Sequence, residues 1–373
     1  MSEWIDVGAV DDLKREIGGT GVTEVRAGRY RVALSCKDGR FGAINGVCNH
    51  VGGPLGKGTL EGDYITCPWH YWKFHFQTGV GEPGFEADKV PMHDVKVENG
   101  RVLVSAEPKT KRGKAPHPRD PLTRKLDRDP GPIRVVGIST TVMTPGHPRY
   151  STSDALLTQA LEAARETGAE TNLLRLDDLR FKNCEGYFSK SFRACTWPCS
   201  ITQADQKDEM RAVYEALIYW SDVALIATPI RWGNPSSLYV KMVERMNCVH
   251  DTSLHGELLI RNKIAGFIIT GGQDGIQAVA GQLLCFWSEI GYLFPQFPFI
   301  AHSRGWTAED MENNIKYVQQ SEELREGARD LAHRAVEYAK VVLAHHEAKR
   351  KHTTRAGRKG YDAAEHSKEE ALA

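Results

Sequence analysis

The chain has 373 residues, 41% hydrophobic and 26% charged, a composition typical of a globular protein with two or three domains. Lys+Arg and Asp+Glu both number 48, so the net charge is zero and gives no support for a protein that binds nucleic acid. No run of 18 apolar residues occurs, which excludes a membrane-spanning helix. The acidic N-terminus lacks an apolar signal core, so we expect a cytoplasmic protein whose cysteines are reduced thiols or metal ligands.

Residues 1–107 are rich in glycine and in short runs in which apolar and polar residues alternate, as in β-strands. These runs occupy residues 28–36, 40–46, 63–67 and 93–106. Asn99-Gly100 separates two alternating runs and predicts a tight hairpin. We therefore predict that residues 1–107 form an all-β domain.

Two short pairs of cysteine and histidine in this domain have the spacing C-x-H-x16-C-x2-H. The four residues are Cys48, His50, Cys67 and His70. Paired cysteines and histidines at short spacing are typical of metal ligands, either for zinc or for an iron–sulfur cluster. Each pair holds one Cys and one His, which favours a cluster in which one iron takes both thiolates and the other both imidazoles.

The flanking sequences, CNHVGGPLGKG at 48–58 and CPWHYWKFHFQTG at 67–79, closely resemble the Rieske family, and a zinc ribbon is the alternative. The resemblance implies a two-iron two-sulfur cluster held by two hairpin loops, with the outer edges of both imidazoles reaching solvent. Gly53 and Trp69 stand where high-potential Rieske proteins carry an extra disulfide, which implies the ferredoxin type. Tyr71 replaces the glycine that usually follows the second histidine.

Residues 108–130 contain prolines at positions 108, 116, 118, 121 and 130 and carry more basic than acidic residues. They show no apolar periodicity. We predict an extended linker stiffened by proline, and a long surface loop of one large domain is the alternative.

From residue 131 onward, apolar strands alternate with amphipathic helices. We predict strands at 133–139, 171–176, 223–230, 263–272 and 297–301. We predict helices at 151–168, 207–221, 236–247, 275–290 and from about 308 into the 340s. This alternation predicts a doubly wound, five-stranded parallel sheet in residues 131–346, and residues 347–373 read as a charged, disordered tail.

Three loops at the carboxyl ends of these strands contain candidate ligand-binding residues. The first loop ends in hydroxyl side chains at a helix N-terminus, where free N–H groups favour an anion. The second reads TPIRWGNPS from residue 228, and the third reads TGGQDG from residue 270. Together the loops resemble the flavodoxin-like NADPH-dependent FMN reductase and iron–sulfur flavoprotein group.

That resemblance implies that the first loop holds the FMN phosphate and that the other two bracket the isoalloxazine ring through backbone groups. The predicted FMN-binding residues are Ser139, Ser151, Thr152, Ser153, Thr228, Pro229, Ile230, Arg231, Trp232, Gly233, Asn234, Thr270, Gly271 and Gly272. A flavodoxin-like scaffold without a flavin is the alternative.

Some relatives of this group bind a four-iron cluster through four cysteines in the loop after the second strand, beginning C-x-G-C. Here Tyr187 stands where the second cysteine would be. We therefore interpret Cys184, Cys195 and Cys199 as thiols that bind no metal. We interpret Cys36, Cys248 and Cys285 as small buried apolar residues.

The two resemblances together imply an oxidoreductase that uses NADPH or NADH, FMN and a Rieske cluster, with electrons leaving to a redox partner or a small acceptor. No catalytic acid or base is predicted, because hydride transfer to a flavin needs none. The alternatives are reverse flow, in which FMN reduces a quinone or nitro compound, and a non-catalytic redox sensor or carrier. The reductase relatives place FMN near a subunit interface, which implies a homodimer or homotetramer.

Overall fold

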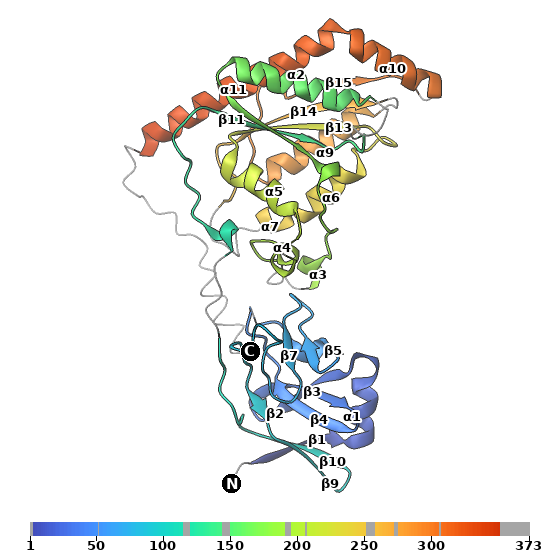
Figure 1. Ribbon diagram of the computed structural model, residues 1–373, viewed down its shortest axis with the longest axis vertical. Coiled ribbons are helices and arrows are strands. Elements are labelled where there is room, and N and C mark those ends of the chain that lie inside the picture. Colours follow the sequence, from blue (N-terminus) through green and yellow to red (C-terminus); the bar gives the residue numbers. More distant parts are fainter. Residues whose placement is uncertain are drawn as a thin grey trace. The chain divides into compact units, whose positions relative to one another are not determined.

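The computed structural model describes residues 3–50, 52–114, 120–143, 150–190, 195–205, 207–250, 258–271, 275–305 and 307–350 (Figure 1). The chain divides into two compact units. The first unit comprises Met1–Asp120 together with Glu185–Thr196, and the second comprises Pro121–Cys184 and Trp197–Ala373. The segment Glu185–Thr196 therefore belongs to a different unit from the residues on either side of it, which the sequence did not predict.

Short antiparallel strands build the first unit, in three sheets among the described residues. One sheet has the order β1 (Trp4–Ala9), β10 (Arg101–Ser105) and β9 (Val95–Glu98). The second has the order β2 (Val22–Ala27), β3 (Tyr30–Lys37), β4 (Arg40–Asn45) and β8 (Met92–His93). The third contains β5 (Thr59–Glu61), β6 (Tyr64–Thr66) and β7 (Lys73–His75).

The predicted hairpin is confirmed, since β9 and β10 pair across Asn99 and Gly100, both of which have positive φ. One helix, α1 (Val10–Ile17), was not predicted. It buries Leu13 and Ile17 against the strands and exposes its charged residues. A single amphipathic helix of eight residues is too short to stand out from alternating strand patterns.

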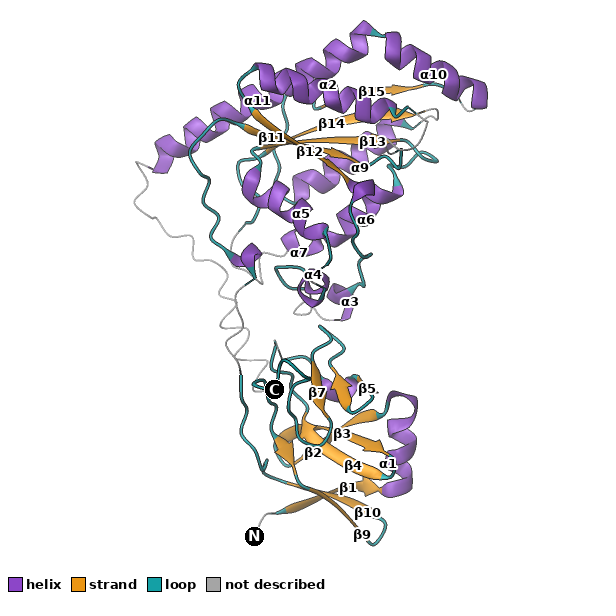
Figure 2. Ribbon diagram, in the orientation of Figure 1, coloured by secondary structure: helices purple, strands orange, loops and turns teal. Residues whose placement is uncertain are grey.

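A five-stranded parallel sheet forms the centre of the second unit, as predicted. Its order is β12 (Glu170–Arg175), β11 (Arg134–Ser139), β13 (Val223–Pro229), β14 (Ile264–Gly271) and β15 (Phe299–Ser303). The helices α2 (Thr152–Glu166) and α11 (Glu322–Arg350) cover one face, and their apolar residues join those of the strands in one core (Figure 2). The helices α5 (Met210–Tyr214), α6 (Ser237–Arg245) and α9 (Ile276–Glu289) lie on the opposite face (Figure 2).

Several helices differ in detail from the prediction. The long final helix is divided at Ser321 into α10 (Ala308–Gln320) and α11, because Ser321 has an extended ψ of 109°. The predicted helix at 207–221 consists of α5 and a π-helical turn, Glu215–Trp220. The remaining short helices are α3 (Tyr187–Lys190), α4 (Ser200–Ala204) and α7 (Asn247–His250).

The C-terminal helix α11 continues into the region predicted as a tail, and residues 351–373 lie outside the described residues. Among the described helices, none has the length and apolar character needed to cross a lipid bilayer.

Both ends of the predicted linker are bound to their own unit. In the first unit, Lys89 and Gly113 exchange backbone hydrogen bonds of 2.8 and 2.9 Å. In the second unit, Leu122 is fully buried and Arg128 donates to Asp222 at 2.7 Å. These residues are therefore anchored and cannot act as a free tether.

Candidate functional site

The four predicted metal ligands lie together in two loops of the first unit. Cys48 and His50 follow β4, and Cys67 and His70 follow β6. The two thiols are hydrogen-bonded to each other, and the centroids of the two imidazole rings are 4.4 Å apart. The Nδ1 atoms of both histidines are buried. Two adjacent thiols beside two adjacent imidazoles match the ligand set of a cluster that takes two protein ligands on each iron.

Hydrogen bonds from the second loop favour the thiolate form of Cys67. The bond from Cys48 and the backbone N–H groups of Trp69 and His70 lower the pKa of Cys67, against the opposing effect of burial. The same bond between the thiols, with burial, raises the pKa of Cys48. Since metals bind thiolates, the loop donates N–H groups where negative charge is required.

Because Gly53 has no side chain, the first ligand loop can lie close to Cys67 of the second. The Cys48 N–H donates to the Gly53 carbonyl at 2.9 Å. A Cβ atom at position 53 would lie 2.7 Å from Cys67 Sγ, closer than such atoms approach. A cysteine could not occupy this position without a shift of the loop, so the loop is built without the extra disulfide of high-potential Rieske proteins.

The start of the predicted linker holds the first ligand loop in place. Asn49, which lies between Cys48 and His50, is buried and donates from Nδ2 to the Gly113 carbonyl at 2.6 Å. Arg112 donates to Asn49 Oδ1 and, at 2.8 Å, to Asn45 Oδ1. Sequence reasoning missed this role, because a single arginine in a basic stretch carries no signal of its own.

The expectation that both imidazole edges reach solvent is wrong for His70. The His70 side chain is 4% exposed, and the ring of Tyr187 lies edge-on to it with the centroids 6.1 Å apart. His50 is half-buried and stacks on Trp72 at 5.0 Å. The two histidines therefore have different surroundings.

The predicted FMN-binding loops follow β11, β13 and β14, which are neighbours in the sheet. The Ile230 N–H donates to the Thr270 carbonyl at 2.8 Å, which joins the second and third loops. Thr152 Oγ1 lies 2.6 Å from Thr270 Oγ1, which joins the first loop to the third. The carboxyl edge of the sheet thus brings together the three loops, where parallel sheets bind their ligands.

Hydroxyl groups surround the N-terminus of α2 in the first loop. Ser151 caps the helix, and its Oγ accepts from the Asp154 N–H at 3.4 Å. Ser139 at the end of β11 is fully buried, and its Oγ has no hydrogen-bond partner among the described residues. An unsatisfied buried hydroxyl near a helix N-terminus fits the phosphate of FMN, because such a group requires a partner.

A tight turn shapes the second loop. Arg231 and Asn234 exchange backbone hydrogen bonds of 2.7 and 2.9 Å, and Trp232 between them has a φ of 52° and is 82% exposed. A Cβ on Gly271 would lie 2.8 Å from Ile230 Cβ, so only glycine fits there. The turn therefore exposes backbone groups and one aromatic ring at the edge of the sheet, which suits a flat ligand.

The other predicted residues lie in or beside these loops. Thr228 and Ser153 are buried, Pro229 and Gly233 are half-buried, and Gly272 lies outside the described residues. Thr228 has a structural role, since its Oγ1 accepts from the Ser236 N–H at 3.0 Å and caps the turn into α6.

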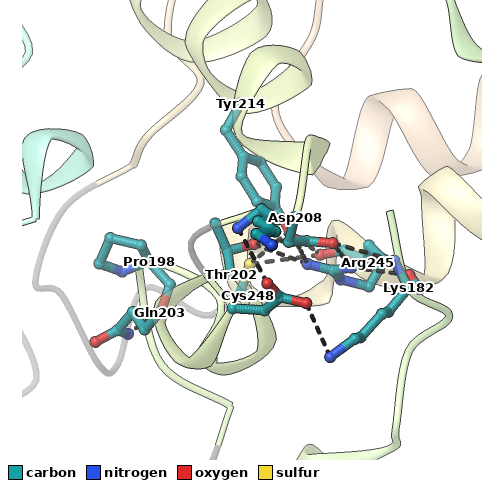
Figure 3. Close-up of polar contacts among 10 residues, drawn as sticks. Lys182, Pro198, Thr202, Gln203, Asp208, Tyr214, Arg245 and Cys248 are labelled. Carbon is teal, nitrogen blue, oxygen red and sulfur yellow. Dashed lines mark hydrogen bonds and ion pairs between the residues drawn. The ribbon is translucent and has the colours of Figure 1, made fainter. Parts of the chain in front are cut away.

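A buried network of charged and polar side chains holds the residues between β12 and α5 against α6 (Figure 3). The side chains of Arg245 and Asp208 are fully buried and joined at 2.6 Å. Thr202 accepts from Arg245 at 2.8 Å and donates to Asp208 at 2.7 Å. Burial alone would raise the pKa of Asp208, but the bonds from Arg245 and Thr202 outweigh it and lower the pKa. This network is structural, and no pattern in the sequence indicates it.

The cysteines outside the metal loops form no disulfide, and all of them lie within the described residues. A hydrogen bond from Cys248 and the charge of Arg245 lower the pKa of Cys199 to about 5, although burial opposes this shift. Cys248 is buried as predicted, whereas Cys36 is half-buried and Cys285 is exposed, so the prediction is wrong for Cys285.

Comparison with family models matches each unit to a known family. Residues 3–93 match the Rieske [2Fe-2S] domain, and residues 134–306 match NADPH-dependent FMN reductase. The two matches follow the order predicted from the sequence.

Two relatives and one solved structure are similar to parts of the chain. The ferredoxin component of the alkene monooxygenase system of Xanthobacter autotrophicus is 38% identical over 115 residues, which cover 30% of this chain and 89% of the relative. Human apoptosis-inducing factor 3 is 37% identical over 83 residues, which are 22% of this chain and 14% of that protein. RosB with a bound 8-demethyl-8-formylriboflavin-5′-phosphate intermediate aligns with 62% of this chain and 92% of its own, at 20% identity and a TM-score of 0.46.

Proposed function

We propose, from the premise that this chain belongs to the Rieske [2Fe-2S] family through its first unit and to the NADPH-dependent FMN reductase family through its second, that it oxidises NADPH and delivers the electrons singly to a separate acceptor. As an oxidoreductase it would combine both cofactors in one chain. When bound, FMN accepts two electrons as a hydride, and a Rieske cluster carries one electron at a time.

One observation supports the proposal: the same chain brings together candidate ligands for both cofactors. Cys48, His50, Cys67 and His70 would hold the cluster. The Ser139 hydroxyl and the N-terminus of α2 would hold the FMN phosphate, and the turn at Trp232 would border the ring. No acid–base residue of the chain would be required for that chemistry.

The acceptor that we propose is a one-electron redox protein. The relative from Xanthobacter autotrophicus is the ferredoxin component of a monooxygenase system, and a relative from Ralstonia, 30% identical over 104 residues, is the ferredoxin component of naphthalene dioxygenase and salicylate hydroxylase systems. Both names describe proteins that work with separate components. We extend that arrangement to the first unit of this chain.

We also propose a homo-oligomer, but α11 gives it little support. Of its apolar residues near the C-terminus, Val342 is buried, and Tyr338 and Leu343 pack against the core of the second unit. Val341 alone of this group is largely exposed. Light scattering at micromolar concentration would decide, and a monomer would contradict the proposal.

The test is anaerobic rapid mixing of the full chain with NADPH. Flavin absorbance should fall first, and the electron paramagnetic resonance signal of the reduced cluster should follow at a rate independent of protein concentration. The Cys67→Ser variant should retain flavin reduction and lack the second phase. A cluster that stays oxidised, or that is reduced only at a rate proportional to protein concentration, would contradict the internal relay, that is, electron transfer from FMN to the cluster within one molecule.

A further inference from the structure

The segment that begins at Glu185 lies against the metal loops of the first unit. Glu185–Thr196 belongs to that unit, although Cys184 and Trp197 on either side belong to the second. Within this segment α3 starts at Tyr187, and the Ser189 N–H donates to the Gly186 carbonyl at 3.0 Å. A short ordered turn is thus supplied to the Rieske unit from the reductase part of the sequence.

One carboxylate oxygen links this turn to the second metal loop. Tyr71, the residue after the ligand His70, donates its hydroxyl to Glu185 Oε2 at 2.8 Å. Tyr187 donates to the same oxygen at 3.0 Å. Hydrogen bonds to a charged acceptor are stronger than neutral ones. The two phenols therefore share one acceptor, the carboxylate of Glu185.

The ring of Tyr187 covers His70. Its centroid lies 6.1 Å from that of His70, with the planes at 72°, and 6.3 Å from that of Tyr71. Tyr187 is 4% exposed and His70 is 4% exposed, whereas the next residue, Phe188, is 49% exposed. The helix α3 thus turns one aromatic ring inward over the ligand and the next one outward.

The backbone of Tyr71 indicates that this contact has a use. Tyr71 has a φ of 59°, a left-handed conformation that is strained for a residue with a bulky side chain. Glycine would adopt it without strain. In this conformation the Tyr71 hydroxyl reaches Glu185, and the bond between them favours the conformation.

We propose that Glu185 and Tyr187 form a cap that closes the His70 edge of the cluster, so that an external one-electron redox protein exchanges electrons at the His50 edge. His50 is half-buried and lies parallel to Trp72, with an interplanar angle of 8°. His50 is thus more exposed than His70, which is 4% exposed. The proposal rests on the proposed function only in taking the cluster to be bound.

The cap predicts how fast the reduced cluster reacts with a protein acceptor. The full chain, loaded with the cluster and freed of FMN so that bound flavin adds no electrons, is reduced with dithionite, desalted and mixed with ferric cytochrome c, so that each cluster loses one electron and each haem gains one. The Tyr187→Ala variant should react about two-fold faster, because two imidazole edges rather than one become available for docking. The Phe188→Ala variant, which removes the neighbouring outward ring, should react at the wild-type rate.

A second measurement does not depend on electron transfer. Pulsed electron paramagnetic resonance of the reduced cluster in D₂O detects exchangeable deuterons near the histidine rings. The deuterium signal should increase in Tyr187→Ala, increase less in Tyr71→Phe, which keeps the ring of Tyr187 over His70 but loses the hydroxyl bonded to Glu185, and stay unchanged in Phe188→Ala.

Equal rates and equal deuterium signals in Tyr187→Ala and wild type would overturn the cap, as would the same increase in Phe188→Ala. Because dithionite reduces the cluster directly, these outcomes are independent of the relay from NADPH. A chain that shows the expected increases but no cluster reduction by NADPH would retain the cap and lose the proposed function.

Discussion

The metal loops and the flavin loops differ in how they are built. The cluster site consists of side chains with particular chemistry, two thiols and two imidazoles brought together by two short loops. The proposed flavin site consists mainly of backbone, such as the turn between Arg231 and Asn234 and the close approach of Gly271 to Ile230. Ligand residues can be identified one by one from a motif, whereas a backbone site is identified only as a set of loops at one edge of a sheet.

Removing a metal ligand should have the largest effect and tests whether the two sites are independent. The Cys67→Ser variant should lose the cluster completely, because the iron loses a thiolate that nothing else supplies. FMN should remain bound, since its loops lie in the second unit. Iron, acid-labile sulfide and flavin analyses measure both. The Cys36→Ser variant is the matched control and should retain both groups.

Breaking the buried ion pair should destabilise the second unit. The Asp208→Asn variant leaves the fully buried Arg245 without its counter-charge and should lower the free energy of unfolding by about 3–5 kcal/mol. Since the folded pKa of Asp208 is lowered, its contribution is present above the ordinary aspartate pKa of about 3.9 and is lost as the pH falls through the folded pKa.

The difference in stability between Asp208→Asn and wild type should therefore be constant near neutral pH and shrink at pH values below about 4. Denaturant titration at several pH values measures it. A variant as stable as wild type at pH 7 would show that the ion pair between Asp208 and Arg245 does not stabilise the second unit. The cluster content should not change, because the network lies outside the metal loops.

Removing the side chain that supports the first metal loop should have a smaller effect than breaking the buried ion pair. The Arg112→Ala variant removes the donors to Asn49 and Asn45, and loss of such a supporting contact lowers metal affinity by about 10–100-fold. Cluster loss in the presence of a chelator measures the change. Arg124, in the same predicted linker, pairs with Glu215 in the second unit, so Arg124→Ala should lose its cluster at the wild-type rate.

These contacts explain which features the sequence could predict. The ligand motif, the five strands and the three loops depend on residue type and local periodicity, and the family matches confirm the fold that they imply. The contacts of Asn49 with Arg112 and of Tyr71 with Glu185 join residues 63 and 114 positions apart. No local pattern marks such pairs, because each partner alone looks like an ordinary surface residue.

The smallest predicted effects concern two serines of the proposed phosphate loop. Replacing them should change the stability of the flavin-free protein in opposite directions. Ser151 caps α2, so Ser151→Ala should destabilise the flavin-free protein by about 1 kcal/mol. Ser139 buries an unsatisfied hydroxyl, so Ser139→Ala removes a polar group that costs about 1–3 kcal/mol to bury and should stabilise the flavin-free protein. Both variants should bind FMN more weakly, because each loses a hydroxyl from the anion site.

Thermal unfolding without flavin, together with fluorescence titration of FMN, separates the two effects. If Ser139 has only a packing role, Ser139→Ala will become more stable while its affinity for FMN remains that of wild type. A loss of affinity together with a gain in stability would identify a hydroxyl whose desolvation is compensated only when the phosphate is bound. The backbone site would then contain at least one side chain that acts as a ligand, as the side chains of the metal loops do.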